Sequence, residues 1–135
     1  MTIPVEQIEG ACPGMAGSVR LRYGLREDLS DAIESPWVEV NEASDFIHHF
    51  DLKGLKPDST YYYASQTRAA DSTEHAESRG KFFTAPEPGT PSELHFCVMT
   101  CQGYPDRDHE DGHPIYPSML ALEPKFVTMT GDLVY

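Results

Sequence analysis

Several short segments in the first part of the chain have the alternating apolar and polar residues of half-buried β-strands. In residues 18–23 (SVRLRY) every second residue is apolar, and residues 37–40, 46–52, 60–67 and 81–84 also have strand composition. Turn-forming glycine, proline and aspartate separate them, as in GLKPDS before residue 60. Short strands that recur about every 8 to 12 residues predict an antiparallel β-sandwich.

A Pro-rich segment follows these strands. Residues 86–93 contain three prolines and a glycine, a composition that stops strands and helices alike. We therefore expect a linker there, between a sandwich domain over residues 1–85 and a second region over residues 94–135. Because a sandwich of this kind has about seven strands, the five segments found predict that the first domain lacks its first strands.

The second region has a different apolar pattern. Residues 94–100 (LHFCVMT) and 126–130 (FVTMT) are nearly continuous apolar runs, as is typical of strands buried on both faces of a sheet. Between them, residues 114–123 can form a short helix with Met119, Leu120 and Leu122 turned inward. Strand, helix and strand in this order predict a βαβ unit with parallel strands.

Charge and composition exclude some classes of function. The formal net charge is -12, from 22 acidic and 10 basic residues, so the surface repels polyanions and the chain is not expected to bind nucleic acid. No run of residues is long and apolar enough for a transmembrane segment. Residues 1–12 have neither the positive nor the apolar part of a signal peptide, so none is predicted in this chain.

The residues that could bind a ligand stand just after the two apolar runs. Ligands of parallel α/β sheets gather beyond the carboxyl ends of the strands, where Cys101 follows the first run and Asp132 follows the second. Tyr135 stands three residues after Asp132, close enough to reach the same site. An Asp after Gly is also common in ordinary turns, so a purely structural interpretation stays open. The three cysteines form no CxxC pair, which disfavours a disulfide framework or a zinc ribbon.

Longer segments resemble a known enzyme family. FCVMTCQGY at residues 96–104 and FVTMTGDLVY at residues 126–135 are similar to the opening of the catalytic domain in alkaline phosphatase D (PhoD-like) metallophosphoesterases. GLKPDSTYYY and GKFFTAP resemble the E–F corner and last strand of a fibronectin type III-like domain, with a tyrosine in the position of a tyrosine corner. The resemblance covers residues 18–135. It implies an all-β sandwich (fibronectin III/Ig-like) followed by the first βαβ unit of an α/β metallophosphatase domain, cut short.

The resemblance also implies a metal site and a reaction. It makes Cys101, Asp132 and Tyr135 ligands of Fe(3+), with Asp132 bridging to Ca(2+), and it makes a phosphomonoester or phosphodiester the substrate. Thiolate and phenolate donors suit ferric iron, and a carboxylate suits both metals. The family's habit implies a secreted or periplasmic protein. Thr100 stands where the family commonly has a serine, which keeps a hydroxyl group.

Other residues could also bind a metal, and other functions also fit the sequence. Asp108, His109 and Asp111 lie in an acidic loop that can bind an additional metal or contact substrate, or simply be solvated. The Asn-His motif and the later Asp and His ligands of the family are not in this sequence, so we expect the chain by itself to be inactive. One alternative is an adhesion or binding module built on the sandwich. A nucleotidase is disfavoured, because most such families begin with an Asp-x-His pair where this chain has Cys101.

Overall fold

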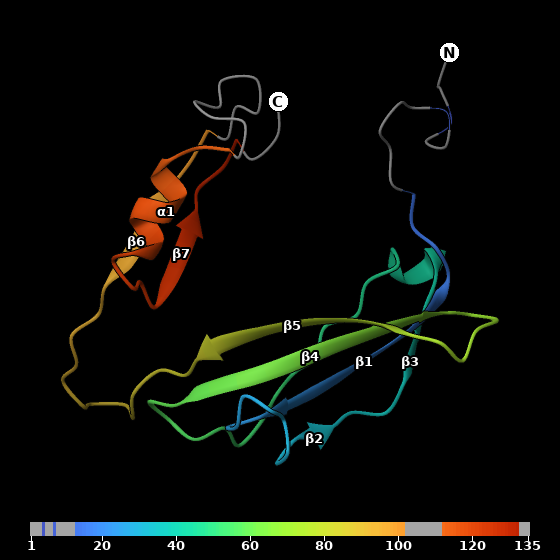
Figure 1. Cartoon of the computed structure of the whole chain (residues 1–135), viewed down its shortest axis with the longest axis horizontal. Coiled ribbons are helices and arrows are strands. Elements are labelled where there is room, and N and C mark those ends of the chain that lie inside the picture. The colour runs from blue at the N-terminus through green and yellow to red at the C-terminus, as the bar shows by residue number, and fades with distance from the viewer. Residues whose placement is uncertain (1–3, 5–6, 8–12, 102–111, 133–135) are drawn as a thin grey trace. The chain divides into compact units, whose positions relative to one another are not determined.

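The chain divides into two compact units, residues 1–87 and residues 88–135, and the division falls within the Pro-rich segment (Figure 1). The structure is a computed structural model that describes residues 13–101 and 112–132, together with Pro4 and Gln7. In this described part, no helix is long and apolar enough to cross a membrane. Each unit is considered by itself below.

The first unit is built on one antiparallel sheet. Its strands lie in the order β2-β1-β4-β5, and β3 also pairs with β1. The predominance of β-structure predicted from the sequence is confirmed, although the two-residue strand β2 was not expected. A short 3-10 turn, Glu42–Ser44, follows β3. The strands are β1 (Gly17–Gly24), β2 (Ile33–Glu34), β3 (Val38–Val40), β4 (Thr60–Ala69) and β5 (Ala76–Phe83).

The pleat of this sheet separates apolar from charged side chains. Tyr61 of β4 pairs with Phe82 of β5, and their rings stack with centroids 5.5 Å apart. The tilted ring of Tyr23 lies on the same face, 6.3 Å from Tyr61. The opposite face carries Arg22, which forms an ion pair of 2.7 Å with Glu34 on β2. The alternation seen in the sequence therefore becomes one aromatic face and one charged face.

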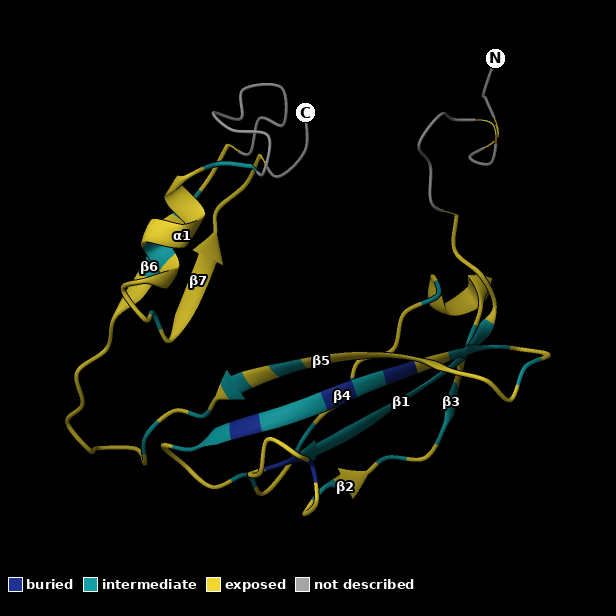
Figure 2. Ribbon diagram, in the orientation of Figure 1, coloured by how far each residue is buried: buried dark blue, intermediate teal, exposed yellow. Residues whose placement is uncertain are grey.

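The core of the first unit centres on β4 and is small (Figure 2). Among the described residues, the buried apolar side chains are Leu29, Tyr61 and Ala64, and Gln66 is buried and polar. The hydroxyl of Tyr61 accepts a hydrogen bond of 3.0 Å from the backbone N–H of Lys56, in the turn just before β4. This bond fixes the turn against the strand, as a tyrosine corner does in sandwich domains.

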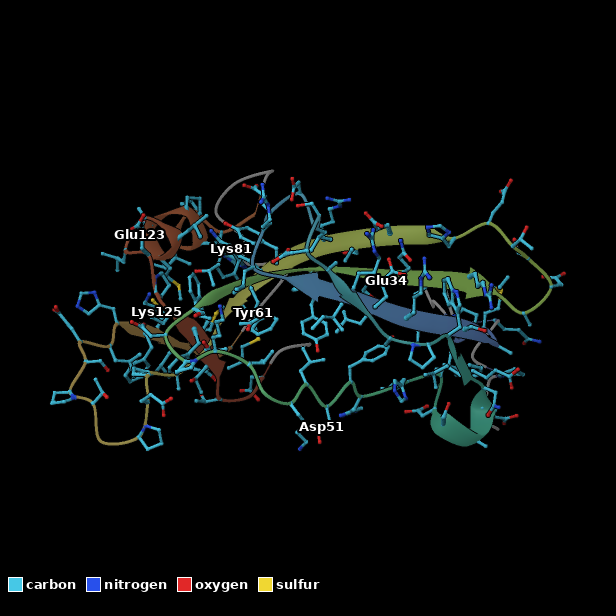
Figure 3. All side chains as sticks on the ribbon, turned by 90° about the horizontal axis from the view of Figure 1, so that it is seen from below. Glu34, Asp51, Tyr61, Lys81, Glu123 and Lys125 are labelled. Atoms are coloured by element: carbon cyan, nitrogen blue, oxygen red, sulfur yellow. The ribbon has the colours of Figure 1, made fainter. Side chains whose placement is uncertain are left out.

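Residues 46–52, which we expected to form a strand, are not part of any sheet in the described structure. The segment passes along the aromatic face of the sheet, with Asp51 directed away from it (Figure 3). Its composition favours a strand, but a strand also needs a neighbour for its backbone hydrogen bonds. No such neighbour lies beside it in the described residues, so the expectation of a paired strand was wrong.

The second unit contains two parallel strands, β6 (Phe96–Met99) and β7 (Phe126–Met129). The helix α1 (Ile115–Leu120) stands between them in the sequence. Phe96 pairs with Phe126, and the two rings stack with centroids 5.1 Å apart.

The expected burial of this second unit is not found for most of its apolar residues, although Met119 is half-buried. Both rings of the Phe96 and Phe126 pair are exposed, and Leu120 and Leu122, expected to turn inward, are 76% and 67% exposed. Two strands and one short helix have too few side chains to cover both faces of a sheet.

Candidate metal centre

The two candidate ligands in the described part of the chain follow the two parallel strands. Backbone hydrogen bonds continue past the strand ends, from Thr130 N to Met99 O at 2.9 Å and from Cys101 N to Gly131 O at 3.3 Å. Cys101 and Asp132 then adopt left-handed backbone conformations, with φ of 58° and 52°. The chain therefore turns sharply at neighbouring positions, just after the end of each strand. These two turns bring Cys101 and Asp132 side by side.

The side chains of these residues meet. Cys101 Sγ donates a hydrogen bond to Asp132 Oδ2 across 3.5 Å, and both side chains are exposed. The hydroxyl of Thr100 donates to the carbonyl oxygen of Gly131 at 3.1 Å. Thr100 therefore braces the turn that carries Asp132 against the turn that carries Cys101. A thiol and a carboxylate share one accessible point beyond the carboxyl ends of two parallel strands.

Comparison with known proteins finds a likeness between this chain and phosphatases. No family model matches the chain. A solved structure titled "Structure of PhoD" matches with a TM-score of 0.67 over 93% of this chain, at 22% sequence identity. An acid phosphatase from Aspergillus ficuum is 37% identical over 65 residues, which is 48% of this chain. The predicted resemblance to the PhoD-like phosphatases is confirmed.

The extent of the PhoD-like match limits what it shows. At 22% identity, the likeness to the PhoD structure is one of fold. This chain spans 23% of that PhoD chain and 10% of the acid phosphatase. The matching part corresponds to an N-terminal portion of such a phosphatase.

The separation of Cys101 and Asp132 fits the metal that the PhoD-like resemblance implies. Metal–thiolate bonds are about 2.3 Å long and metal–carboxylate bonds about 2.0 to 2.2 Å, so two such donors on one ion stand roughly 3 to 3.6 Å apart. The observed 3.5 Å between sulfur and oxygen lies in this range. Within the described residues, however, no group of three or more His, Cys, Asp or Glu side chains is placed to hold an ion.

The other candidate site residues are not placed. Tyr135, Asp108, His109 and Asp111 lie outside the described residues, so the structure does not test their assignment. His113, the last member of the Asp- and His-rich segment, is described and half-buried, and its ring stands edge-on to Tyr116 at 5.7 Å. This contact gives His113 a packing role at the start of α1.

One residue with a role at the site was missed by sequence reasoning. Thr100 was noted only as a departure from the family pattern, yet its hydroxyl makes the hydrogen bond to Gly131. The available signal was the hydroxyl residue directly before Cys101 at the end of a strand. A side chain at that position lies beside the neighbouring strand end, where the carbonyl oxygen of Gly131 can accept a second hydrogen bond besides the one from Cys101 N.

Proposed function

We propose that this chain is the N-terminal portion of a metal-dependent phosphoric ester hydrolase, an alkaline phosphatase or phosphodiesterase of the PhoD-like type. The observation that carries this proposal is the contact between Cys101 Sγ and Asp132 Oδ2 at 3.5 Å. A thiolate paired with a carboxylate at the ends of two parallel strands is a donor set that suits a transition metal.

Each residue of the site has a distinct task in this proposal. Cys101 and Tyr135 would hold Fe(III) through electron-rich sulfur and oxygen, and Asp132 would supply carboxylate oxygen to Fe(III) and Ca(II). When bound, these metals supply the positive charge that polarises the phosphoryl oxygens of a phosphomonoester or phosphodiester. Thr100 positions Asp132 by holding the carbonyl of Gly131.

The architecture proposed for the parent protein has two parts. The first unit is a fibronectin III/Ig-like sandwich, an interpretation that the hydrogen bond from Lys56 N to Tyr61 Oη supports. The second unit is the first βαβ unit of an α/β metallophosphatase domain, supported by the parallel pairing of β6 with β7. By the same resemblance we propose that the parent protein is secreted or periplasmic.

The chain alone lacks the remaining parts of a catalytic site. Hydrolysis with two metals needs further ligands, a group that aligns the nucleophile and donors for the charge that develops on phosphate. We therefore propose that the 135-residue chain is inactive. Metal-dependent turnover of p-nitrophenyl phosphate by the purified chain would contradict this.

Visible absorption tests the metal site without relying on activity. We expect ferric nitrilotriacetate added to the chain to produce a charge-transfer band from thiolate and phenolate donors. Cys101→Ala and Tyr135→Phe should each weaken or shift this band. Cys97→Ala, which removes the half-buried cysteine of β6, is the matched control and should leave it unchanged. No band, or a band equally sensitive to Cys97→Ala, would refute the proposed ligand set.

A further inference from the structure

The threonines that directly follow β6 and β7 each bond to the end of the other strand (Figure 1). Thr100 Oγ1 donates to Gly131 O at 3.1 Å. In the other direction, Thr130 Oγ1 donates to Met99 O at 3.3 Å. Both carbonyl oxygens also accept a backbone N–H, the first from Cys101 and the second from Thr130 itself. The two hydroxyl bonds and two backbone bonds join the strand ends reciprocally, and we call this set the threonine clasp.

The residues just beyond the clasp have a backbone conformation that needs support. Cys101 and Asp132 both have positive φ, 58° and 52°. Such left-handed conformations are uncommon for residues other than glycine, and aspartate tolerates them better than cysteine does. They cost free energy and persist where the surrounding structure over-determines them. The clasp supplies that support, because its bonds fix the backbone immediately before each of the two turns.

We propose that Thr130 is, with Thr100, a positioning residue of the metal site. In this proposal the clasp holds Cys101 Sγ and Asp132 Oδ2 at coordination distance before a metal binds, since its bonds join protein groups only. Donors that are already in place lose less freedom when an ion binds, which raises the affinity of the site. The inference rests on the proposed function for the kind of ligand that the two side chains receive.

Thr130 gives the sharper test of the two threonines. Thr100 Oγ1 also lies 3.6 Å from Cys101 Sγ, so removing it changes the surroundings of the sulfur directly. The hydroxyl of Thr130 bonds to a backbone carbonyl of the other strand and acts on the metal donors through the backbone. Valine keeps the branched shape and strand preference of threonine but has no hydroxyl, whereas serine keeps the hydroxyl.

A disulfide at the site measures the clasp without a metal. Asp132→Cys places a second thiol beside Cys101, and Cys12→Ala with Cys97→Ala removes the two other cysteines of the chain. The equilibrium of this full-length variant with reduced and oxidised glutathione gives the effective concentration of the two remaining thiols. That concentration reports how closely the two turns are held together.

Removal of either clasp hydroxyl should lower this effective concentration. Thr130→Val and Thr100→Val should each lower it by about threefold or more, as expected for loss of one hydrogen bond. Thr130→Ser should stay close to the threonine value. Thr128→Val, the same change at an exposed position within β7, is the control and should have no effect. Unchanged values in both clasp variants, or an equal fall with Thr128→Val, would overturn the proposal.

Ferric ion binding separates this proposal from the proposed function. With Cys101 and Asp132 in place, Thr130→Val should weaken binding of ferric ion by about threefold or more. The wavelength of the charge-transfer band should not change, because the ligands are the same. If the wild type bound no ferric ion, the proposed function would fail, while a fall in the disulfide equilibrium would still support the clasp. If Thr130→Val bound the ion as tightly as the wild type, the positioning role would be overturned.

Discussion

The sulfur of Cys101 lies 3.5 Å from a carboxylate oxygen of Asp132, although 31 positions separate the two residues in the chain. The contact depends on the parallel register of β6 and β7, in which Met99 pairs with Met129. Each strand is followed by a left-handed turn, so both side chains project from the same edge of the sheet. The proposed metal ligands are therefore positioned by backbone pairing, and the hydroxyl of Thr100 braces it.

Thiol alkylation should distinguish the proposed ligand from its neighbour in the strand. Cys101 is exposed and Cys97 is half-buried, so iodoacetamide should modify Cys101 faster in the metal-free chain. Bound ferric ion should then slow modification of Cys101 alone, because a coordinated thiolate is a poor nucleophile. Asp132→Asn should lower metal affinity by at least about tenfold and remove this protection. Peptide mass spectrometry after fixed reaction times measures each cysteine, and equal protection of both would contradict a site at Cys101.

Tyr61→Phe should destabilise the first unit without disturbing its packing. The change removes only the oxygen that accepts the hydrogen bond from Lys56 N. Loss of one such bond costs about 1 kcal/mol of unfolding free energy. Urea unfolding followed by fluorescence of Trp37, the single tryptophan of the chain, measures it. Tyr62→Phe, on the opposite face of the same strand, is the control; an equal loss there would show that the corner bond has no special role.

The fold of the first unit could be predicted in part because its strands are amphipathic. The alternation in residues 18–23 correctly placed apolar side chains on one face of β1. Residues 46–52 have the same kind of composition but lack a pairing partner in the described structure, so composition alone predicted a strand where none forms. Pairing depends on what lies beside a segment in space, and a local pattern does not contain that information.

The candidate site was predictable to a similar degree. The apolar runs show where the strands end, and parallel strands bring their carboxyl ends to one edge of the sheet. Cys101 and Asp132 could therefore be expected to approach each other. The sequence shows a hydroxyl residue at Thr100 beside the strand end, but not its partner, because the hydrogen bond crosses to the other strand and depends on the register. The apolar run around Phe96 suggested burial on both faces, but burial requires covering elements, and Phe96 and Val98 are exposed in the described unit.

Gly80→Ala should disturb the aromatic face through Tyr63. The two residues pair across β4 and β5, and a Cβ at Gly80 would lie 2.5 Å from Tyr63 Oη and 2.6 Å from its Cζ. The ring must move, so we expect a loss of about 1 to 3 kcal/mol in unfolding free energy. In the background of Tyr63→Leu the same change should cost much less, because the ring is gone. Equal costs in both backgrounds, measured by urea unfolding, would exclude this contact as the cause.

Acid should lower the unfolding free energy of the first unit, partly because Glu77 loses its charge. Its pKa lies below the usual value, first because Gln66 Nε2 donates to it at 2.6 Å and second because Arg79 donates at 2.7 Å. A carboxylate whose pKa is lowered on folding stabilises the fold above its unfolded pKa, near 4.5, and loses that contribution as the pH falls through its folded pKa. Because the side chain is partly exposed, solvent screening keeps this contribution below about 1 kcal/mol.

Glu77→Gln isolates that contribution. The variant cannot lose a charge on acidification, so the drop in its unfolding free energy between pH 6 and pH 3 should be smaller than that of the wild type. Glu87→Gln, at an exposed position in the Pro-rich segment, serves as the control and should follow the wild type. Urea unfolding followed by Trp37 fluorescence gives all three curves. If the Glu77 variant lost as much stability as the wild type, the hydrogen bonds from Gln66 and Arg79 would not contribute to the pH dependence.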